Sequence, residues 1–220
     1  LPIYTFGRYV DEEIAQELMR RPEASLLGGE KREVAILFAD LRDFTPLAET
    51  LTPEATIHLV NRFFGRMVEV IRKHRGIIED FLGDAILAFF DPLDRPLAPA
   101  VEQALRCALE MQRAMAEVNA GGGGTFASLK MGIGLHAGEV VVGNVGAESR
   151  AKYGIIGAAV NLTHRIQGQA RGGEVVVSDA ALRLGQKVVA VSREFTARLK
   201  GIHEPMVLYA VEALPDSPGS

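Results

Sequence analysis

The sequence predicts an α+β domain with a mainly antiparallel sheet, and three observations carry this prediction. Two apolar runs, residues 77–82 and 85–90, flank only Gly83 and Asp84, which is the pattern of a tight β-hairpin. Apolar residues at helical spacing recur between the strand-like runs. Two further apolar runs follow within residues 187–213. Hairpins that alternate with helices produce a sheet with helices packed on it.

The composition is that of an ordinary globular protein, and it excludes several classes of function. The chain has 220 residues, is 48% hydrophobic, and carries 24 Lys and Arg against 28 Asp and Glu. This mild charge, without basic runs, argues against nucleic acid as a partner. The single cysteine, Cys107, excludes a disulfide framework and is expected in the core. No apolar run reaches the roughly 20 residues that span a bilayer, so we expect a cytoplasmic domain.

We expect three segments along the chain. Residues 1–30 contain one short helical pattern and then a stretch rich in Pro and Gly, which predicts a coupling helix and linker. Residues 31–213 form the domain, and residues 214–220 form a disordered tail. The abrupt start suggests a fragment of a longer protein.

The first half of the domain predicts a strand, a helix and the hairpin. Residues 34–40, VAILFAD, form a buried-strand run that ends in a carboxylate. Thr52 and Pro53 fit the N-cap and first position of a helix that Gly76 ends. The apolar positions that repeat along this helix are Ile57, Val60, Phe64, Met67 and Ile71.

The second half predicts two helices and further strands. A helix carries Val101, Leu105, Ala108, Met111, Met115 and Val118 on one face. The glycines at 121–124 predict a plain linker rather than a phosphate-binding loop, because no Gly-Lys-Ser/Thr follows. LKMGIGLHAGEVVVGNVG predicts a second hairpin with its turn near Ala137 and Gly138. Residues 157–170 predict a third helix, and residues 173–178 predict a strand.

Two aspartates are candidates for a shared site. Asp40 ends one strand and Asp84 lies at the tip of the hairpin, so the two carboxylates could converge. Mg²⁺ prefers oxygen ligands and is usually held by one or two carboxylates together with substrate phosphates. Single aspartates at turns also serve merely as caps, and the pairing alone does not name a reaction.

Four motifs resemble those of a known family. FADLRDFT (38–45), FLGDAILAFF (81–90), GLHAGEVVVGNVG (134–146) and VNLTHR (160–165) occur in this order. Together they closely resemble the catalytic domain of class III adenylate and guanylate cyclases, over about residues 32 to 212. The leading FGRYV (6–10) is similar to the coupling segment of bacterial receptor cyclases, which suits a fragment of a membrane or sensor protein with the upstream part missing.

The resemblance implies a fold, an assembly and a metal site. The fold would be a ferredoxin-like βαββαβ core, and a head-to-tail homodimer would form two composite active sites at its interface. Asp40 and Asp84 would hold two Mg²⁺ or Mn²⁺ ions with help from the Leu41 carbonyl. Backbone N–H groups near Phe44 and Thr45 would contact the triphosphate.

The resemblance also implies the residues that act on the nucleotide. The partner protomer would bring Asn161, which positions the ribose, and Arg165, which steadies charge on the α-phosphate. Lys200 matches a family lysine that contacts the terminal phosphates, and Arg150 could do the same. The ribose 3′-hydroxyl, with its pKa lowered by one metal, would attack the α-phosphorus, and pyrophosphate would leave.

The family reads its base at two positions, here Asp80 and Gly154. A carboxylate only accepts hydrogen bonds, which matches the N1–H and amine of guanine and fails against N1 of adenine. We therefore slightly favour GTP over ATP, although Gly154 supplies no donor for the guanine O6. By the alternation of a strand, Asp80 faces the base, and Glu79 is expected in solvent.

Alternatives remain open at this point. The chain could be an adenylate cyclase that uses ATP, or a catalytically silent cyclase-like module that dimerises and binds a nucleotide. The family usually has a small residue at position 43 instead of Asp43, and Gly-Asp-Thr-Val-Asn where this chain has GAAVN (157–161). A diguanylate cyclase would need a Gly-Gly-Asp/Glu-Glu-Phe hairpin, and the hairpin here is LGDAI.

Overall fold

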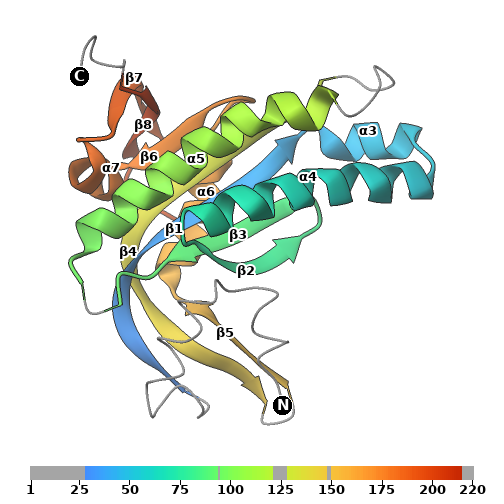
Figure 1. Cartoon of the computed structure of the whole chain (residues 1–220). Coiled ribbons are helices and arrows are strands. Elements are labelled where there is room, and N and C mark those ends of the chain that lie inside the picture. The colour runs from blue at the N-terminus through green and yellow to red at the C-terminus, as the bar shows by residue number, and fades with distance from the viewer. Residues whose placement is uncertain (1–27, 94, 121–127, 148–149, 215–220) are drawn as a thin grey trace, which may run out of the picture.

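The protein is a single sheet with helices on both faces, as a computed structural model shows (Figure 1). The structure describes residues 28–93, 95–120, 128–147 and 150–214. Within them, the structure has eight strands, which form the sheet, and five helices. The predicted α+β class is therefore confirmed. The expected coupling segment and tail lie almost entirely outside the described residues.

The core follows the order βαββαβ along the chain. Its elements are β1 (Gly28–Arg42), α4 (Pro53–Lys73), β2 (Ile77–Leu82), β3 (Ala85–Phe90), α5 (Leu97–Ala120) and β4 (Lys130–Ala147). In space the strands are ordered β2-β3-β1-β4, and every neighbouring pair among them is antiparallel. This arrangement confirms the ferredoxin-like core.

The β2–β3 hairpin has the predicted bounds and the predicted turn. Ala85 pairs with Leu82, so Gly83 and Asp84 alone make the turn. Gly83 has φ 67°, a left-handed conformation that glycine adopts without a steric penalty. All six residues of β3 are buried because the strand lies inside the sheet.

The expected turn at Ala137 and Gly138 is wrong. β4 runs through both residues without a break, and they pair with Ala35 and Val34 of β1. Gly138 is needed for space rather than for a turn, because a Cβ there would lie 2.8 Å from Nε2 of His136. β4 instead pairs with β5 (Arg150–Ile156) beyond the point where the turn was expected.

Helix α4 begins as predicted, but a different face is buried. The Thr52 side chain accepts a hydrogen bond from the Ala55 N–H at 3.2 Å, and Pro53 is the first helical residue. The buried residues are Leu59, Phe63, Met67, Val70 and Ile71. Ile57, expected on the core face, is 59% exposed. The two stripes overlap at Met67 and Ile71, so the apolar pattern alone did not settle the helix rotation.

The remaining elements complete the sheet and its covering. They are α3 (Phe44–Thr50), α6 (Ala158–Gln167), β6 (Val175–Ser178), α7 (Asp179–Gly185), β7 (Val189–Ala197) and β8 (Met206–Ala213). The short helices α3 and α7 were not anticipated from the sequence. β6 runs parallel to β4, and the other pairs are antiparallel.

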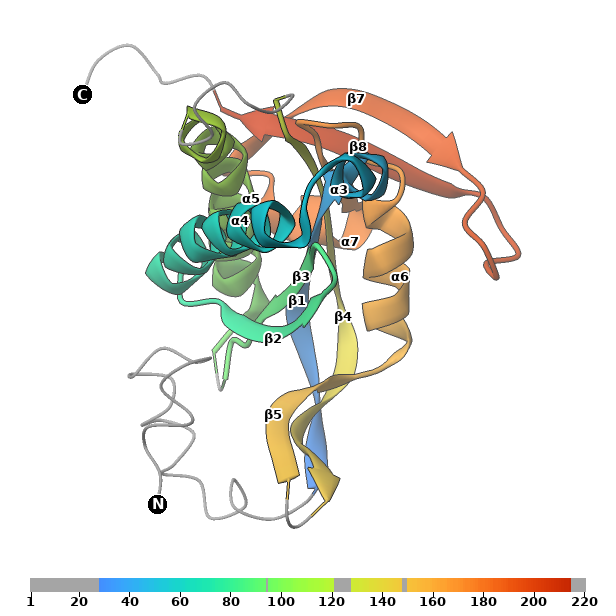
Figure 2. The ribbon, with the colours of Figure 1, turned by 90° about the vertical axis from the view of Figure 1, so that its right-hand side faces the viewer.

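The helices divide between the two faces of the sheet, as Figure 2 shows edge-on: α4 and α5 cover one face and α6 covers the other. Leu37 and Ala39 of β1 belong to the core beneath α4 and α5. Ile36 and Phe38 belong to the core that includes Ala159 of α6. Among the described residues, no helix is long and apolar enough to cross a membrane.

Candidate active site

The two predicted metal-binding aspartates lie together in the structure. Asp40 on β1 pairs with Ala85 on β3, the residue that follows Asp84. The carboxyl groups of Asp40 and Asp84 come within hydrogen-bonding reach, and both residues are half-buried. β1 extends two residues beyond Asp40, so this aspartate is held inside the strand ladder rather than at its frayed end.

This contact puts two like charges close together. The pKa of Asp84 is raised to about 7, first by burial and then by the hydrogen bond and the charge of Asp40. Backbone hydrogen bonds, including one from Leu41, partly offset this rise. A cation bound between these two half-buried carboxyl groups would relieve the repulsion between their charges.

The donor set at this place suits a hard cation. It consists of two carboxylates beside the backbone of Leu41, and Mg²⁺ commonly takes one or two carboxylates and completes its shell with substrate phosphates and water. Among the described residues, no group of three or more His, Cys, Asp or Glu side chains could hold a metal by itself. The residues therefore fit ions that bind together with a phosphorylated substrate, and fit a dedicated protein cage poorly.

The segment after Asp40 leads directly into helix α3. Asp43 is the N-cap of this helix and has φ 56°, in the left-handed region. Asp tolerates this conformation better than most residues, and glycine tolerates it best. This conformation suits the glycine that the family resemblance leads one to expect at position 43. Phe44 and Thr45 are the first two residues of α3 and have N–H groups without intrahelical partners.

Helix α6 carries the residues expected to contact ribose and phosphate. Asn161 is exposed and Arg165, four residues later on the same side, is half-buried. The guanidinium of Arg165 lies beside Gly201, where a Cβ would be 3.5 Å from its Nη2. Lys200 is exposed in this loop between β7 and β8. The Arg165 guanidinium thus lies beside the residue that follows Lys200 in the chain.

Close packing fixes α6 on the sheet. The ring of His164 stacks on Phe38 of β1 at 4.7 Å. Arg42 donates a hydrogen bond to the carbonyl of Gln167, and its guanidinium crosses over Gly132. Because Arg42 follows Asp40 by two residues, β1 carries both the candidate metal ligand and the anchor of α6.

The expected position of Glu79 in solvent is wrong. A β-bulge between Ile78 and Asp80 breaks the alternation of β2. The Glu79 side chain is only 8% exposed, whereas that of Asp80 is 49% exposed. Burial raises the pKa of Glu79 above its ordinary value.

Strand β5 contacts β2 at this bulge. Gly154 is buried, and the Ile155 N–H donates to Oε2 of Glu79 at 2.9 Å. Lys152 donates to Oδ2 of Asp80 at 2.9 Å, a partner that the sequence reasoning missed. The side chain of Arg150, the other expected phosphate contact, lies outside the described residues.

Comparison with known proteins identifies the fold family. The model of the adenylate and guanylate cyclase catalytic domain matches residues 28–213. The chain belongs to this family. The resemblance drawn from the four motifs is therefore confirmed, and the residues described above lie in a cyclase catalytic domain.

Curated relatives are longer than this chain. An uncharacterized protein of Mycobacterium tuberculosis, MT1361, is 34% identical over 98% of the chain, which spans 37% of that protein. An uncharacterized protein of Mycobacterium bovis, Mb1354c, is 39% identical over 73% of the chain, and the match spans 27% of it. The cyclase domain thus spans only about a third of the curated relatives that it matches.

Solved structures include cyclases of both base preferences. The guanylyl cyclase Cya2 has a TM-score of 0.81 and 40% identity, covering 86% of this chain and 96% of that one. The adenylyl cyclase CyaB from P. aeruginosa also has a TM-score of 0.81, at 28% identity, covering 88% of this chain and all of that one. Neither comparison by itself decides the base for the present cyclase domain.

Proposed function

We propose that this cyclase domain converts a purine nucleoside triphosphate, GTP in preference to ATP, into the 3′,5′-cyclic monophosphate and pyrophosphate. The observation that carries the proposal is the contact between the Asp40 and Asp84 carboxyls at the β2–β3 hairpin. Family membership supplies the reaction class. A product of this kind is a second messenger, so the domain would serve intracellular signalling.

The carboxylate pair would hold two Mg²⁺ or Mn²⁺ ions together with the triphosphate. These ions would supply a lowered pKa for the ribose 3′-hydroxyl and charge neutralisation for the departing pyrophosphate. The carboxylates of Asp40 and Asp84 would bind the ions and so position the triphosphate, and the Leu41 carbonyl would supply a third oxygen ligand. Phe44 and Thr45 offer backbone N–H groups to the phosphates. No protein nucleophile is required.

Helix α6 would act on the reacting nucleotide. Asn161 orients the ribose so that its 3′-oxygen faces the α-phosphorus, and Arg165 stabilises the charge that grows on the α-phosphate. Lys200 contacts the terminal phosphates, and its place in the loop beside Arg165 supports that role. Arg150 stays a prediction for the same task.

The active unit would be a homodimer with composite sites. Two exposed apolar side chains flank the site residues and support a protein interface there. Leu82, two residues before Asp84, is 50% exposed, and Ile156, at the end of β5, is 56% exposed. The cytoplasmic location and an upstream sensor remain predictions.

Two observations bear on the base. The Asp80 side chain on β2 is 49% exposed, so its carboxylate is open to accept hydrogen bonds from guanine. The solved structure that is 40% identical to this chain is that of a guanylyl cyclase. One observation favours ATP as the second candidate: Lys152 beside Asp80 could donate to N1 of adenine while the carboxylate accepts from its amine.

The test is product formation from GTP and ATP in parallel, with Mg²⁺ and then with Mn²⁺. We expect cyclic nucleotide and pyrophosphate in equal amounts, and faster turnover of GTP. Faster turnover of ATP would replace the guanylate assignment by the adenylate one. Absence of product from both would show a silent module and end the catalytic proposal.

A further inference from the structure

The space at position 154 is filled by a side chain from another strand. A Cβ built on Gly154 would overlap both carboxylate oxygens of Glu79. The absent side chain therefore leaves no gap, because the Glu79 carboxylate lies where a side chain of residue 154 would begin. The register of β2 against β3 shifts at this place, between Ile78 and Asp80.

The Glu79 carboxylate is held firmly in that position. Its Oε2 accepts a hydrogen bond from the Ile155 N–H at 2.9 Å, and its Oε1 lies 3.2 Å from Nζ of Lys152. The side chain is 8% exposed. A buried carboxylate with two fixed donors is a preorganised acceptor, since each oxygen keeps further lone pairs for a ligand.

Lys152 links this carboxylate to Asp80. Its ammonium lies 2.9 Å from Oδ2 of Asp80 and also donates to the backbone carbonyl of Glu79 at 3.3 Å. The Lys152 side chain is 49% exposed, so the ammonium can turn toward a ligand without leaving the cluster. Two carboxylates and one ammonium thus converge from β2 and β5.

Used together in one pose, these three groups fit the edge of guanine and not that of adenine, although Lys152 and Asp80 alone could also pair with adenine. Guanine presents two neighbouring donors, the N1–H and the amine, beside one acceptor, O6. Adenine presents one donor, its amine, beside one acceptor, N1. Two acceptors with one donor can satisfy all three groups of guanine, whereas in the same pose the adenine amine would face the ammonium of Lys152.

We propose that Glu79 and Lys152 are specificity-determining residues that complete guanine recognition around Asp80 in place of a side chain at position 154. Glu79 and Asp80 accept from the guanine donors, and Lys152 donates to O6. The inference rests on the proposed function, because it assumes that the base of the substrate lies at this cluster.

The experiment measures kcat/KM for GTP and ATP in the wild type, Glu79→Gln and Lys152→Met. Each variant should lower kcat/KM for GTP by about tenfold, as expected for the loss of a hydrogen bond to a charged group. The value for ATP should stay within about twofold or rise, because neither variant removes a group that adenine uses in this pose. A matched loss for both substrates would show a merely structural role and overturn the inference, as would no change for either.

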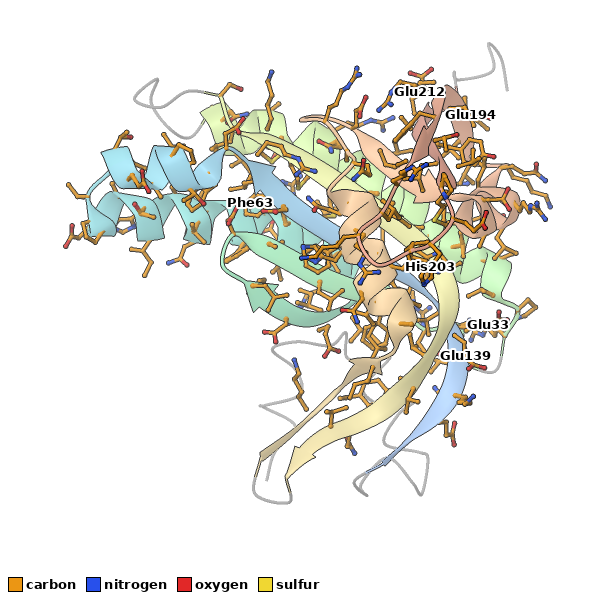
Figure 3. The ribbon with its side chains drawn as sticks, turned by 180° about the vertical axis from the view of Figure 1, so that it is seen from behind. Glu33, Phe63, Glu139, Glu194, His203 and Glu212 are labelled. Carbon is orange, nitrogen blue, oxygen red and sulfur yellow. The ribbon has the colours of Figure 1, made fainter. Side chains whose placement is uncertain are left out.

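The matched control is the pair formed by Lys31 and Glu139, which also links two strands by an ion pair, at 3.1 Å, with side chains 74% and 61% exposed. Glu139 on β4 pairs with Glu33 on β1, and the two residues lie side by side in Figure 3. Lys31→Met and Glu139→Gln should leave the ratio of the two kcat/KM values unchanged.

Gly154→Ala tests the same idea without removing a charge. The added methyl group must displace the Glu79 carboxylate, so this variant should lose GTP preference as Glu79→Gln does. Retained GTP preference in a folded Gly154→Ala protein would contradict the placement of Glu79 at the base.

Equilibrium binding of fluorescent GTP and ATP analogues separates this inference from the proposed function. If the wild type makes no product yet binds the GTP analogue more tightly, and Glu79→Gln and Lys152→Met abolish that preference, the proposed catalysis fails and the recognition cluster stands. If turnover occurs without any effect of these variants on base preference, the catalysis stands and the recognition cluster fails.

Discussion

Strand β2 is regular where it meets the hairpin and irregular where it begins. At the hairpin end, Leu82 pairs with Ala85 and delivers Asp84 to Asp40 as the sequence predicts. At the other end, β2 has a bulge between Ile78 and Asp80, and the side chains of Glu79 and Asp80, which strict alternation would place on opposite faces, both reach the ammonium of Lys152. This difference shows that the residues of a two-residue turn are enough to determine its geometry. Which face of the sheet a strand side chain points to depends instead on the register with the neighbouring strands.

The largest expected effect lies at the hairpin end. Asp84→Ala should lower turnover by about 100-fold or more, because metal binding contributes several kcal/mol of charge stabilisation and each ~1.4 kcal/mol is a factor of ten in rate. The measurement is initial rate of pyrophosphate release with saturating Mg²⁺ and nucleotide.

Thermal unfolding provides the control for this variant. Asp84→Ala removes one of two adjacent acidic groups, so the melting temperature should not fall. A folded Asp84→Ala protein that keeps Mg²⁺-dependent turnover would contradict the assignment of this carboxylate as a metal ligand.

A mixing experiment tests whether the hairpin of one protomer works with α6 of another. Asp40→Ala and Arg165→Ala proteins should each be inactive alone. In an equal mixture, half of the dimers should be heterodimers, each with one intact composite site, which gives about a quarter of the wild-type activity for a two-fold symmetric dimer. Heterodimers shown to form without recovered activity would rule out shared sites.

A smaller effect is expected from the turn itself. Gly83→Ala meets open space but must keep φ 67°, so we expect a loss of about 1–2 kcal/mol in the free energy of unfolding. Gly65→Ala in the middle of α4 also meets open space and should instead stabilise by about 1 kcal/mol. Urea unfolding of both variants gives the comparison, and equal effects would show that the turn conformation is not strained by a side chain.

The smallest effect concerns the bulged end and is a dependence on pH. The pKa of Glu79 is raised by burial, against the opposing influence of Lys152 and the Ile155 N–H, while Asp80 adds to the rise. The folded state therefore holds this proton more tightly than the unfolded chain. Stability should fall as pH rises from about 4.3, the ordinary value for Glu, through the raised value, and stay level above it.

Urea unfolding from pH 4 to pH 7 measures this slope. Glu79→Gln should show a flatter profile than the wild type, because it removes the titrating group while its side-chain oxygen can still accept from Ile155. Glu139→Gln, an exposed match, should follow the wild type. Identical pH profiles for all three proteins would show that folding does not raise the pKa of Glu79.

Local patterns were sufficient for much of the fold. The hairpin around Gly83, the N-cap at Thr52 and the buried face of α5 followed from short-range spacing, because these features depend on residues close along the chain. The meeting of Asp40 with Asp84 was also foreseen, since the strand order of the family brings their strands together.

Other features could not be foreseen, for reasons of packing. Gly138 has the residue type of a turn, but it lies inside β4, where the absence of a side chain leaves room for His136 and for Ala159 of α6. Ile57 looked like a core residue, yet the sheet and α5 select the stripe that contains Phe63. Periodicity shows that a helix has an apolar face, whereas the contacts between elements decide which of two overlapping stripes is buried.

The sequence by itself determined the family, the order of the core elements and the candidate metal ligands, because these depend on motifs and on turns that involve only a few adjacent residues. Tertiary structure alone decided that Glu79 occupies the space at Gly154 and that Lys152 pairs with Asp80. The physical reason is that one extra residue in a strand breaks the alternation of its side chains, and only the hydrogen-bond register with neighbouring strands reveals that extra residue.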